Sequence, residues 1–309
     1  MFWRLLAAAL ACVAVLAACA PASLTVAEVP EPAGVATARY LGRPEDRFLD
    51  VLTYNAALLP AAVSSTRPAE RVALMAPYLK GYDVLVLQEV FVDEWRERLL
   101  TELADAYPYR GELVGRDGAG GFPFTEDGGI VILSRWPVVR QATMTFGPTC
   151  SGTDCLADKG VAYVAIRKGE RTFHVFGTHA QSVYGFDPAA VRAAQFELFA
   201  GFVAGQDIPE DEPVLLAGDF NVNAYSPELE SMLRTLGASW PPLLGTVRAT
   251  WDPGNNVWAD GPTEWLDYVL VAHGYAVPAA AWNRALPLRV AGMDLSDHHA
   301  VWARVALAR

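Results

Sequence analysis

The chain has 309 residues, of which 52% are hydrophobic and 19% are charged, which is enough to bury a sizeable core. It carries 24 Lys and Arg against 35 Asp and Glu, a formal net charge of −11, and has no basic cluster. Proteins that bind nucleic acid usually present a basic face to the phosphates, so this balance argues against DNA or RNA as a partner.

The first residues have the pattern of a secretory signal. Arg4 precedes an apolar run over residues 5–18 that is short for a bilayer span. The run ends in Leu-Ala-Ala-Cys at 16–19, which resembles a bacterial lipobox, in which the Cys becomes the lipidated first residue. We expect residues 1–19 to be a signal peptide with a lipobox and Cys19 to anchor an exported protein to the cell surface or outer membrane. The alternative is an ordinary signal cut nearby, which would leave Cys19 incidental and the protein secreted.

Residues 20–46 are rich in Pro and Ala and show no periodicity, so we expect them to form a flexible tether. No repeat and no further linker follows them. We therefore expect one domain over residues 47–309.

Short apolar runs alternate with helical patterns through this domain. The runs predict strands at 49–55, 83–89, 128–135, 161–167, 171–179, 212–220, 264–271 and 299–307. Some connections are short enough for hairpins and others long enough for crossovers. This mixture predicts an α/β domain, an α+β four-layer sandwich in which two packed mixed β-sheets are flanked by helices.

The helices have recognisable starts, because Pro is favoured in a first helical turn. We expect them from Pro68 to about Lys80, over residues 93–106, after Asp187-Pro188 and after Ser226-Pro227. In the third helix, one stripe is expected to contain Val191, Gln195, Leu198 and Phe202.

Four cysteines are present. Cys12 lies in the signal, and Cys19 is expected to be lipidated. Cys150 and Cys155 remain, and in an oxidising compartment we expect them to form a disulfide bond. A metal site is the alternative, but no further Cys or close His accompanies this pair.

Polar side chains recur at the ends of the apolar runs. A carboxylate that closes such a run is costly to bury without a cation or a hydrogen-bond donor, and strand ends are where α/β folds build their sites. Each residue alone has another reading, such as a helix cap, a turn or a core histidine, but together they predict one site. They are Asn55, Glu89, His179, Asp219, Asn221, Asp267, Asp297 and His298.

The residue types indicate metal-assisted chemistry. Oxygen ligands without thiolates favour a hard cation such as Mg²⁺, with Mn²⁺ as a second choice. Asp219 and Asn221 are two apart on a segment expected to be extended, so their side chains should face the same way. His298 could serve as a general base, and Asp267 could hold its imidazole in the correct tautomer.

The set Asn55, Gln88-Glu89, Gly-Asp-Phe-Asn at 218–221, Leu-Asp-Tyr at 266–268 and Ser-Asp-His at 296–298 resembles the endonuclease/exonuclease/phosphatase superfamily. This resemblance covers the chain from Phe48 to its C-terminus and implies the DNase I-like fold. It also implies roles for particular residues. Glu89 would bind the metal with Asn55 close by, and Asp219 and Asn221 would orient the phosphate. His298 would be the general base, and Asp267 and Asp297 would support that base or the metal. His179 would bind the phosphate and protonate the leaving alkoxide.

Finer motifs resemble the bacterial neutral sphingomyelinases. They are Gly-Thr-His-Ala-Gln-Ser at 177–182, Arg192 with Gln195, the Cys-containing loop that runs into Asp-Lys-Gly at 158–160, and the Trp-Asp-Pro stretch that starts at 251. The resemblance implies that Lys159 helps to hold the phosphate.

Some of those relatives carry a long aromatic hairpin between the Leu-Asp-Tyr and Ser-Asp-His motifs. The corresponding segment is short here, with Trp282 as the single aromatic of its later half. Trp251, Trp258, Tyr184 and Phe186 are other residues that could engage lipid, and ordinary packing is the alternative for each. A lipid anchor could partly replace the hairpin.

The sequence therefore predicts a monomeric, Mg²⁺-dependent phosphodiesterase that hydrolyses sphingomyelin to ceramide and phosphocholine at a membrane surface. One alternative is the same machinery acting on another phospholipid, a phosphoinositide or nucleic acid. A second is an inactive surface lipoprotein that binds lipid or a host protein, against which the complete set of candidate catalytic residues argues.

Overall fold

The computed structural model describes residues 47–60, 64–118 and 126–307. The expected signal peptide, Cys19 and the tether over 20–46 lie outside these residues. The described strands are β1 (Phe48–Asn55), β2 (Val84–Gln88), β3 (Tyr109–Arg110), β4 (Val131–Ser134), β5 (Val138–Thr145), β6 (Gly160–Lys168), β7 (Arg171–His179), β8 (Val214–Asp219), β9 (Ala238–Ser239), β10 (Asp267–Ala272), β11 (Ala280–Leu286), β12 (Arg289–Val290), β13 (Met293–Asp294) and β14 (Ala300–Ala306). The described helices are α3 (Pro68–Leu79), α4 (Asp93–Leu103), α5 (Pro188–Ala204), α6 (Glu228–Leu236) and the 3₁₀ helix η4 (Gly152–Leu156).

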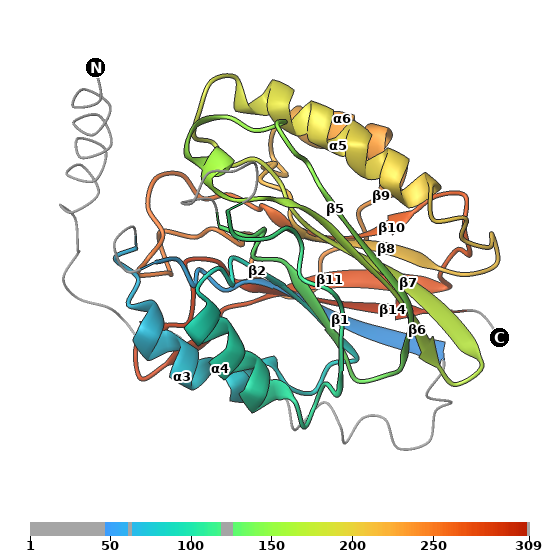
Figure 1. The fold of residues 1–309 in the computed structure, drawn as a ribbon, viewed down its shortest axis with the longest axis horizontal. Helices are drawn as coiled ribbons and strands as arrows, with labels where there is room; N and C mark the ends of the chain where they lie inside the picture. The colour runs from blue at the N-terminus through green and yellow to red at the C-terminus, as the bar shows by residue number, and fades with distance from the viewer. Residues whose placement is uncertain (1–46, 61–63, 119–125, 308–309) are drawn as a thin grey trace.

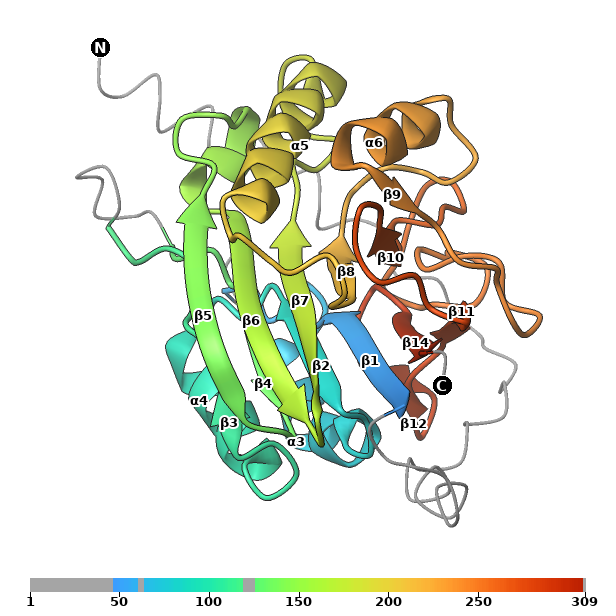
Figure 2. The same cartoon turned by 90° about the vertical axis from the view of Figure 1, so that its right-hand side faces the viewer.

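These elements form four layers (Figures 1 and 2). One sheet has the strand order β11-β14-β1-β2-β4-β3 and is covered by α3 and α4. The other has the order β5-β6-β7-β8-β10-β9 and is covered by α5 and α6. Both sheets contain parallel and antiparallel pairs, so the expected sandwich of two mixed sheets flanked by helices is confirmed.

The alternation of side chains along the strands explains the layers. In β1, Leu49 and Val51 enter the core between the two sheets, whereas Leu52 and Tyr54 face the layer of α3 and α4. Because successive strand side chains point to opposite faces, a strand buried on both sides reads as a continuous apolar run. This burial on both faces is why β1, β2 and β8 were readily predicted from the sequence.

The register of neighbouring strands places the polar strand ends together. Asn55 pairs with Gln88 across the parallel β1–β2 ladder. In the other sheet, Asp219 pairs with His179 on the parallel strand β7 and with Asp267 on the antiparallel strand β10. The last residues of β1, β7 and β8 and the first residue of β10 therefore lie at one end of the sandwich.

Close approach of β7 and β8 next to Asp219 requires a glycine. Gly218 has φ 143°, and a Cβ there would lie 2.0 Å from the Thr178 carbonyl oxygen. No side chain fits in that space, so Gly218 allows the two strands to bring His179 and Asp219 level with each other.

Two sequence expectations differ from the fold. The buried stripe of α5 consists of Arg192, Gln195, Phe196, Phe199 and Val203, whereas the predicted member Leu198 is exposed. The reason is that Arg192 and Gln195 bond to Gln181 and turn a partly polar face inward. The sequence reading also missed the edge strands β5 and β11, which are only partly buried.

The aromatic residues proposed to engage lipid separate into two groups. Trp251 packs on the His298 ring, Trp258 donates its indole N–H to the Asp294 carbonyl oxygen at 2.8 Å, and Trp282 packs on Trp302. Tyr184 and Phe186 are exposed. Among the residues that the structure describes, no helix is both long and apolar enough to cross a membrane.

Candidate active site

Glu89 and Asn55 connect the two sheets at the site. Glu89 follows the last residue of β2 with φ 55°, and its carboxylate accepts a hydrogen bond from Asn55 Nδ2 at 3.0 Å. The same amide donates to Asp219 Oδ2 at 3.0 Å, so one side chain bridges carboxylates from both sheets. Burial and the neighbouring Asp297 charge raise the pKa of Glu89 to about 7. A cation bound beside Glu89 would therefore stabilise the ionised form of its carboxyl group.

Asp219 lies at the centre of the site. Its Oδ2 atom is 3.7 Å from His179 Nε2 and 3.7 Å from His298 Nε2. Burial and the charge of Asp267 raise the pKa of Asp219 to about 6. Two imidazoles therefore face one buried carboxylate, and a cation bound beside Asp219 would favour its ionised form.

The expectation that Asn221 and Asp219 lie on one extended segment was wrong. The strand ends at Asp219, and Asn221 adopts a left-handed conformation with φ 52°. Its backbone N–H donates to Asp219 Oδ1 at 2.9 Å, and its side chain donates to the Ala180 carbonyl oxygen at 3.1 Å. Asn221 still lies at the site, since the turn that follows β8 folds it back beside the end of β7.

His298 and Asp267 form a buried pair. His298 Nδ1 is 2.8 Å from Asp267 Oδ2, so the ionised carboxylate fixes the proton on Nδ1 and leaves Nε2 facing Asp219 as an acceptor. Burial opposes the charged form of His298, but the carboxylates of Asp267 and Asp219 outweigh it and raise its pKa well above the ordinary value. An imidazole held in this way can take a proton from water at Nε2.

His179 is paired differently. Lys159 Nζ lies 3.1 Å from His179 Nε2, and because an ammonium group only donates, the imidazole accepts. Burial, the Lys159 charge and His298 lower the pKa of His179 well below its ordinary value. The expected role of His179 as proton donor to the leaving alkoxide does not fit this arrangement, since its neutral ring already accepts from Lys159. The group with protons to donate here is the Lys159 ammonium.

Asp297 is held at the rim by Ser296. The Ser296 hydroxyl contacts Asp297 Oδ1 at 3.1 Å and donates to the Asn55 carbonyl oxygen at 2.6 Å. Behind them, the buried Arg71 guanidinium donates to the carbonyl oxygens of Ala56 at 2.8 Å and Leu295 at 2.6 Å. The segments that carry Asn55 and Asp297 are therefore fastened to each other.

The donor set fits a divalent hard cation. Carboxylates of Glu89, Asp219 and Asp297 converge on one buried region, and Asp267 Oδ1 has no hydrogen-bond partner among the described residues. Oxygen ligands without a thiolate are the set that Mg²⁺ prefers. Taken purely as a geometric group, Asp219, Asp267 and His298 also offer atoms within 4.8 Å of one another. We assign His298 and Asp267 to proton transfer, because their 2.8 Å contact holds the imidazole with its Nε2 atom directed at Asp219.

A second acidic group, Asp93, Asp117 and Asp127, lies elsewhere in the described chain. Arg96 forms ion pairs with both Asp93 and Asp127. This pairing accounts for two of the three charges, so the group is explained as part of a structural network.

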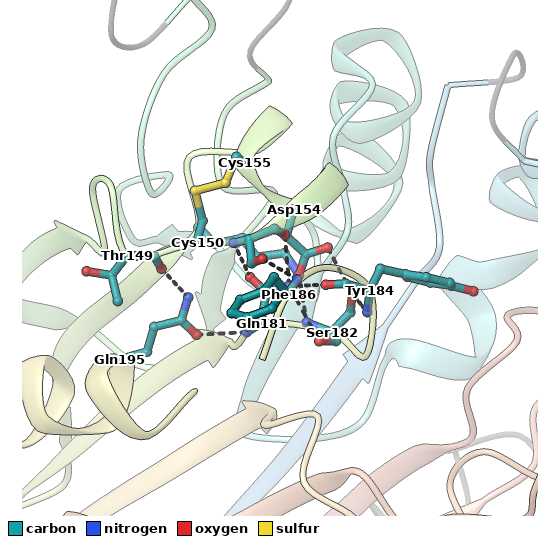
Figure 3. The surroundings of a disulfide bond; sticks show 11 residues. Thr149, Cys150, Asp154, Cys155, Gln181, Ser182, Tyr184, Phe186 and Gln195 are labelled. Atoms are coloured by element: carbon teal, nitrogen blue, oxygen red, sulfur yellow. Dashed lines mark hydrogen bonds and ion pairs between the residues drawn. A yellow bond between two sulfur atoms is a disulfide. The ribbon is translucent and has the colours of Figure 1, made fainter. Parts of the chain in front are cut away.

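The Cys150–Cys155 disulfide bond closes a small loop next to the site. Asp154, inside this loop, accepts from Lys159 Nζ at 2.9 Å. It also accepts from the Ser182 backbone N–H at 2.6 Å (Figure 3). The disulfide loop thus positions the ammonium group that contacts His179.

The structure brings together the residues predicted for catalysis, metal binding and phosphate binding, whereas Cys19 lies outside the described residues. The sequence reading assigned no role to Asp154, Ser296, Arg71 or Thr250, whose hydroxyl accepts from the backbone N–H of Leu266 at 2.9 Å. They support the site residues indirectly, and no strand-end pattern marks them. For Asp154, the two flanking cysteines were a usable signal, since a residue inside a pinned loop is well suited to hold a partner.

Comparisons with known proteins agree with this site. The model of the Endonuclease/Exonuclease/phosphatase family matches residues 52–298. Sphingomyelinase C of Bacillus cereus is 33% identical over 302 residues, which cover 85% of this chain and 90% of the relative. The crystal structure of sphingomyelinase C from Streptomyces griseocarneus superposes with a TM-score of 0.74 and 34% identity, and covers 84% of this chain and 99% of that one.

A further solved structure similar to this chain contains metal ions. A mutant of beta toxin from Staphylococcus aureus with bound magnesium ions has a TM-score of 0.74 and 27% identity, and covers 84% of this chain and 99% of that one. The range matched by the family model, 52–298, contains every residue of the site. The chain therefore belongs to the endonuclease/exonuclease/phosphatase family.

Proposed function

We propose that this chain is a metal-dependent phosphodiesterase that hydrolyses sphingomyelin to ceramide and phosphocholine. The observation that carries the proposal is the buried His298–Asp267 pair, whose free Nε2 faces Asp219 in a carboxylate-rich site. The similarity to proteins named sphingomyelinase C supports sphingomyelin as the substrate.

In the proposed reaction, His298 Nε2 takes a proton from a water molecule as the water attacks phosphorus. Asp267 holds the Nδ1–H through the 2.8 Å contact and stabilises the imidazolium that forms. The phosphorus–oxygen bond to ceramide breaks, and the departing oxygen needs a proton. Lys159 is placed to supply this proton or a hydrogen bond, with His179 holding the ammonium group in place.

Glu89 would hold the cation, with Asn55 and Asp297 beside it. Mg²⁺, when bound, would neutralise charge on the phosphoryl oxygens. Support for Mg²⁺ comes from the oxygen-only donor set, the raised pKa of Glu89 and the magnesium ions in the related beta toxin structure. Mn²⁺ is the second candidate because it shares these ligand preferences.

Asn221 and Asp219 would orient the phosphate. The Asn221 amide already donates to the Ala180 carbonyl oxygen, so its remaining donor is available to a phosphoryl oxygen. The hydrogen bond from its backbone to Asp219 keeps the two side chains in fixed relation. We propose that the enzyme is an exported monomer, anchored through Cys19, and meets its substrate at a membrane surface.

The test is an assay of purified protein against sphingomyelin, phosphatidylcholine, phosphatidylinositol phosphates and DNA, each with Mg²⁺ and with EDTA. We expect phosphocholine to be released from sphingomyelin only with Mg²⁺, and at a higher rate than the hydrolysis of any other substrate tested. Faster hydrolysis of phosphatidylinositol phosphates or DNA would contradict the proposed substrate.

A further inference from the structure

The loop that follows β7 exposes three apolar side chains next to the candidate active site. Val183 is 60% exposed, Tyr184 61% and Phe186 88%. We call these three residues the apolar loop. A soluble surface usually shows such residues singly, and three within four positions mark a contact surface. Phe186 is the most exposed of the three, and its ring lies almost entirely in solvent.

The apolar loop is held in position by the disulfide loop (Figure 3). The Phe186 backbone N–H donates to Ser151 Oγ at 2.6 Å, and Gln181 Nε2 donates to the Tyr184 carbonyl oxygen at 2.7 Å. Gln181 also accepts from the Ser151 backbone N–H at 2.8 Å. Polar groups of the backbone are therefore satisfied inward, and the apolar side chains are left outward.

Backbone packing fixes the same arrangement. Gly185 has φ 114°, and a Cβ there would lie 2.5 Å from Ser151 Oγ, so the two loops approach as closely as a glycine allows. A surface that is ordered before it binds loses less conformational entropy on binding. The contacts thus hold Tyr184 and Phe186 ready to bind another surface.

The apolar loop is continuous with the reacting groups. It begins three residues after Ala180, whose carbonyl oxygen accepts from Lys159 at 3.1 Å. Partial burial and the carboxylates of Asp260 and Asp297 raise the pKa of Tyr184, which places its hydroxyl near the rim that carries Asp297. A substrate held by the apolar loop would therefore have its headgroup close to Lys159.

We propose that the apolar loop inserts into the surface of a lipid bilayer of zwitterionic headgroups and delivers the lipid substrate to the site. This proposal rests on the proposed function for the identity of the substrate. The charge of the surroundings selects the kind of lipid. Asp260 and Asp297 lie near Tyr184, the nearby Lys159 is buried and paired with Asp154, and the chain carries −11 overall. An anionic headgroup would be repelled, whereas phosphocholine carries no net charge.

The experiment uses the full chain carrying Cys19→Ser, so that no acyl chain can dominate membrane binding. Vesicles of phosphatidylcholine without sphingomyelin report binding in the absence of the proposed turnover. We expect Phe186→Ser to weaken binding to these vesicles about tenfold, on the scale of withdrawing one Phe ring from an apolar environment. The side chain of Phe186 is exposed, so its replacement should leave the melting temperature unchanged.

Val277→Ser is the matched control. Val277 is 82% exposed, and the adjacent Ala276 bonds to Glu212, which precedes the start of β8. The control residue thus lies near the opposite end of the strand that carries Asp219. We expect Val277→Ser to bind phosphatidylcholine vesicles as the parent does. Replacing a third of the phosphatidylcholine with phosphatidylserine should weaken binding of the parent protein.

Activity separates docking from chemistry. Phe186→Ser should lower hydrolysis of sphingomyelin in vesicles about as much as it lowers binding, and should leave hydrolysis of a soluble short-chain sphingomyelin unchanged. Equal losses on both substrates would overturn the proposal and assign the loop to the shape of the site. Unchanged vesicle binding by Phe186→Ser, or tighter binding of the parent protein to vesicles that contain phosphatidylserine, would each overturn it as well. If the parent binds vesicles through Phe186 but does not hydrolyse sphingomyelin, the proposed function fails while the docking surface stands.

Discussion

Replacement of Asp267 by Asn tests the assignment of His298 as general base. The two side chains are nearly isosteric, and both Asp267 and His298 are almost completely buried, so the change acts mainly on charge. It removes a negative charge 2.8 Å from His298 Nδ1. It also allows the new amide to donate to Nδ1, which would move the ring proton to Nε2 and block the acceptor that faces Asp219.

Asp267→Asn should change both the pH dependence and the maximal rate of hydrolysis. A general base must be neutral, so activity falls as pH drops through the pKa of His298. Burial opposes protonation, but Asp267 and Asp219 raise this pKa above its ordinary value, so the acidic limb of the parent profile should lie above that value. Removal of one nearby carboxylate should move the limb down by about 1–3 pH units. The plateau should fall by about 10²–10⁴, the usual worth of general-base catalysis.

The assay is the initial rate of sphingomyelin hydrolysis in detergent micelles at saturating Mg²⁺ and fixed ionic strength. The pH is varied from about 5 to about 9, which spans the range in which histidines usually titrate. The matched control is Glu212→Gln, which removes the carboxylate from a different imidazole–carboxylate pair, the one formed with the buried His174. His174 pairs with Val214 at the start of β8, whereas the site lies at the end of that strand. The pH profile of Glu212→Gln should therefore match that of the parent protein. A fall in plateau without any shift of the acidic limb in Asp267→Asn would refute the assignment of His298 as the base.

Glu89→Gln should lower turnover by about 10²–10³ or more and raise the Mg²⁺ concentration needed, with an unchanged circular dichroism spectrum, because it removes the anionic ligand; wild-type activity in the folded variant would show that the metal lies elsewhere. EDTA should stop hydrolysis and Mg²⁺ or Mn²⁺ should restore it better than Ca²⁺, which prefers more ligands, so full activity after dialysis against EDTA is the contrary result. Lys159→Ala and His179→Ala should each impair sphingomyelin hydrolysis more than hydrolysis of a nitrophenyl phosphodiester, whose leaving group needs no proton; equal losses on both substrates would exclude this pair from leaving-group protonation. Cys150→Ser with Cys155→Ser should lower the free energy of unfolding by about 2 kcal/mol in urea titrations, as expected for a short closed loop, and an unchanged midpoint would contradict that role.

Much of the fold was predictable because its central strands are buried on both faces. The apolar runs that form β2 and β8 have no polar interruption before their last residues. A short run of this kind with Gly or Pro near its ends is typical of a buried strand. The helix starts at Pro68 and Pro188 were equally clear. The edge strand β5 was missed because most of its side chains are partly or fully exposed, so neither a continuous run nor a strict alternation was present.

The candidate site was predictable to the extent that its residues end strands. Asp219 and Asp267 close or open apolar runs, and their burial was costly enough to demand an explanation. What could not be predicted is how each side chain is oriented once the strand has ended. Asn221 shows this limit, since the left-handed turn after β8 reverses the direction expected for an extended chain. His179 shows a second limit, because its partner Lys159 comes from the start of another strand and reverses the expected direction of the hydrogen bond.

The arrangement of charges explains why the stability of this site should depend on the packing of the two sheets and on a bound cation. The Asn55 amide donates to both Glu89 and Asp219, one carboxylate from each sheet, at 3.0 Å each. Burial raises the pKa of both carboxyls, so holding them ionised and adjacent works against folding. Packing of the two sheets keeps them together at that cost, and a bound divalent cation would offset it. Metal binding would therefore be coupled to folding of this end of the sandwich, and we expect Mg²⁺ to raise the melting temperature through the same side chains that would carry out the chemistry.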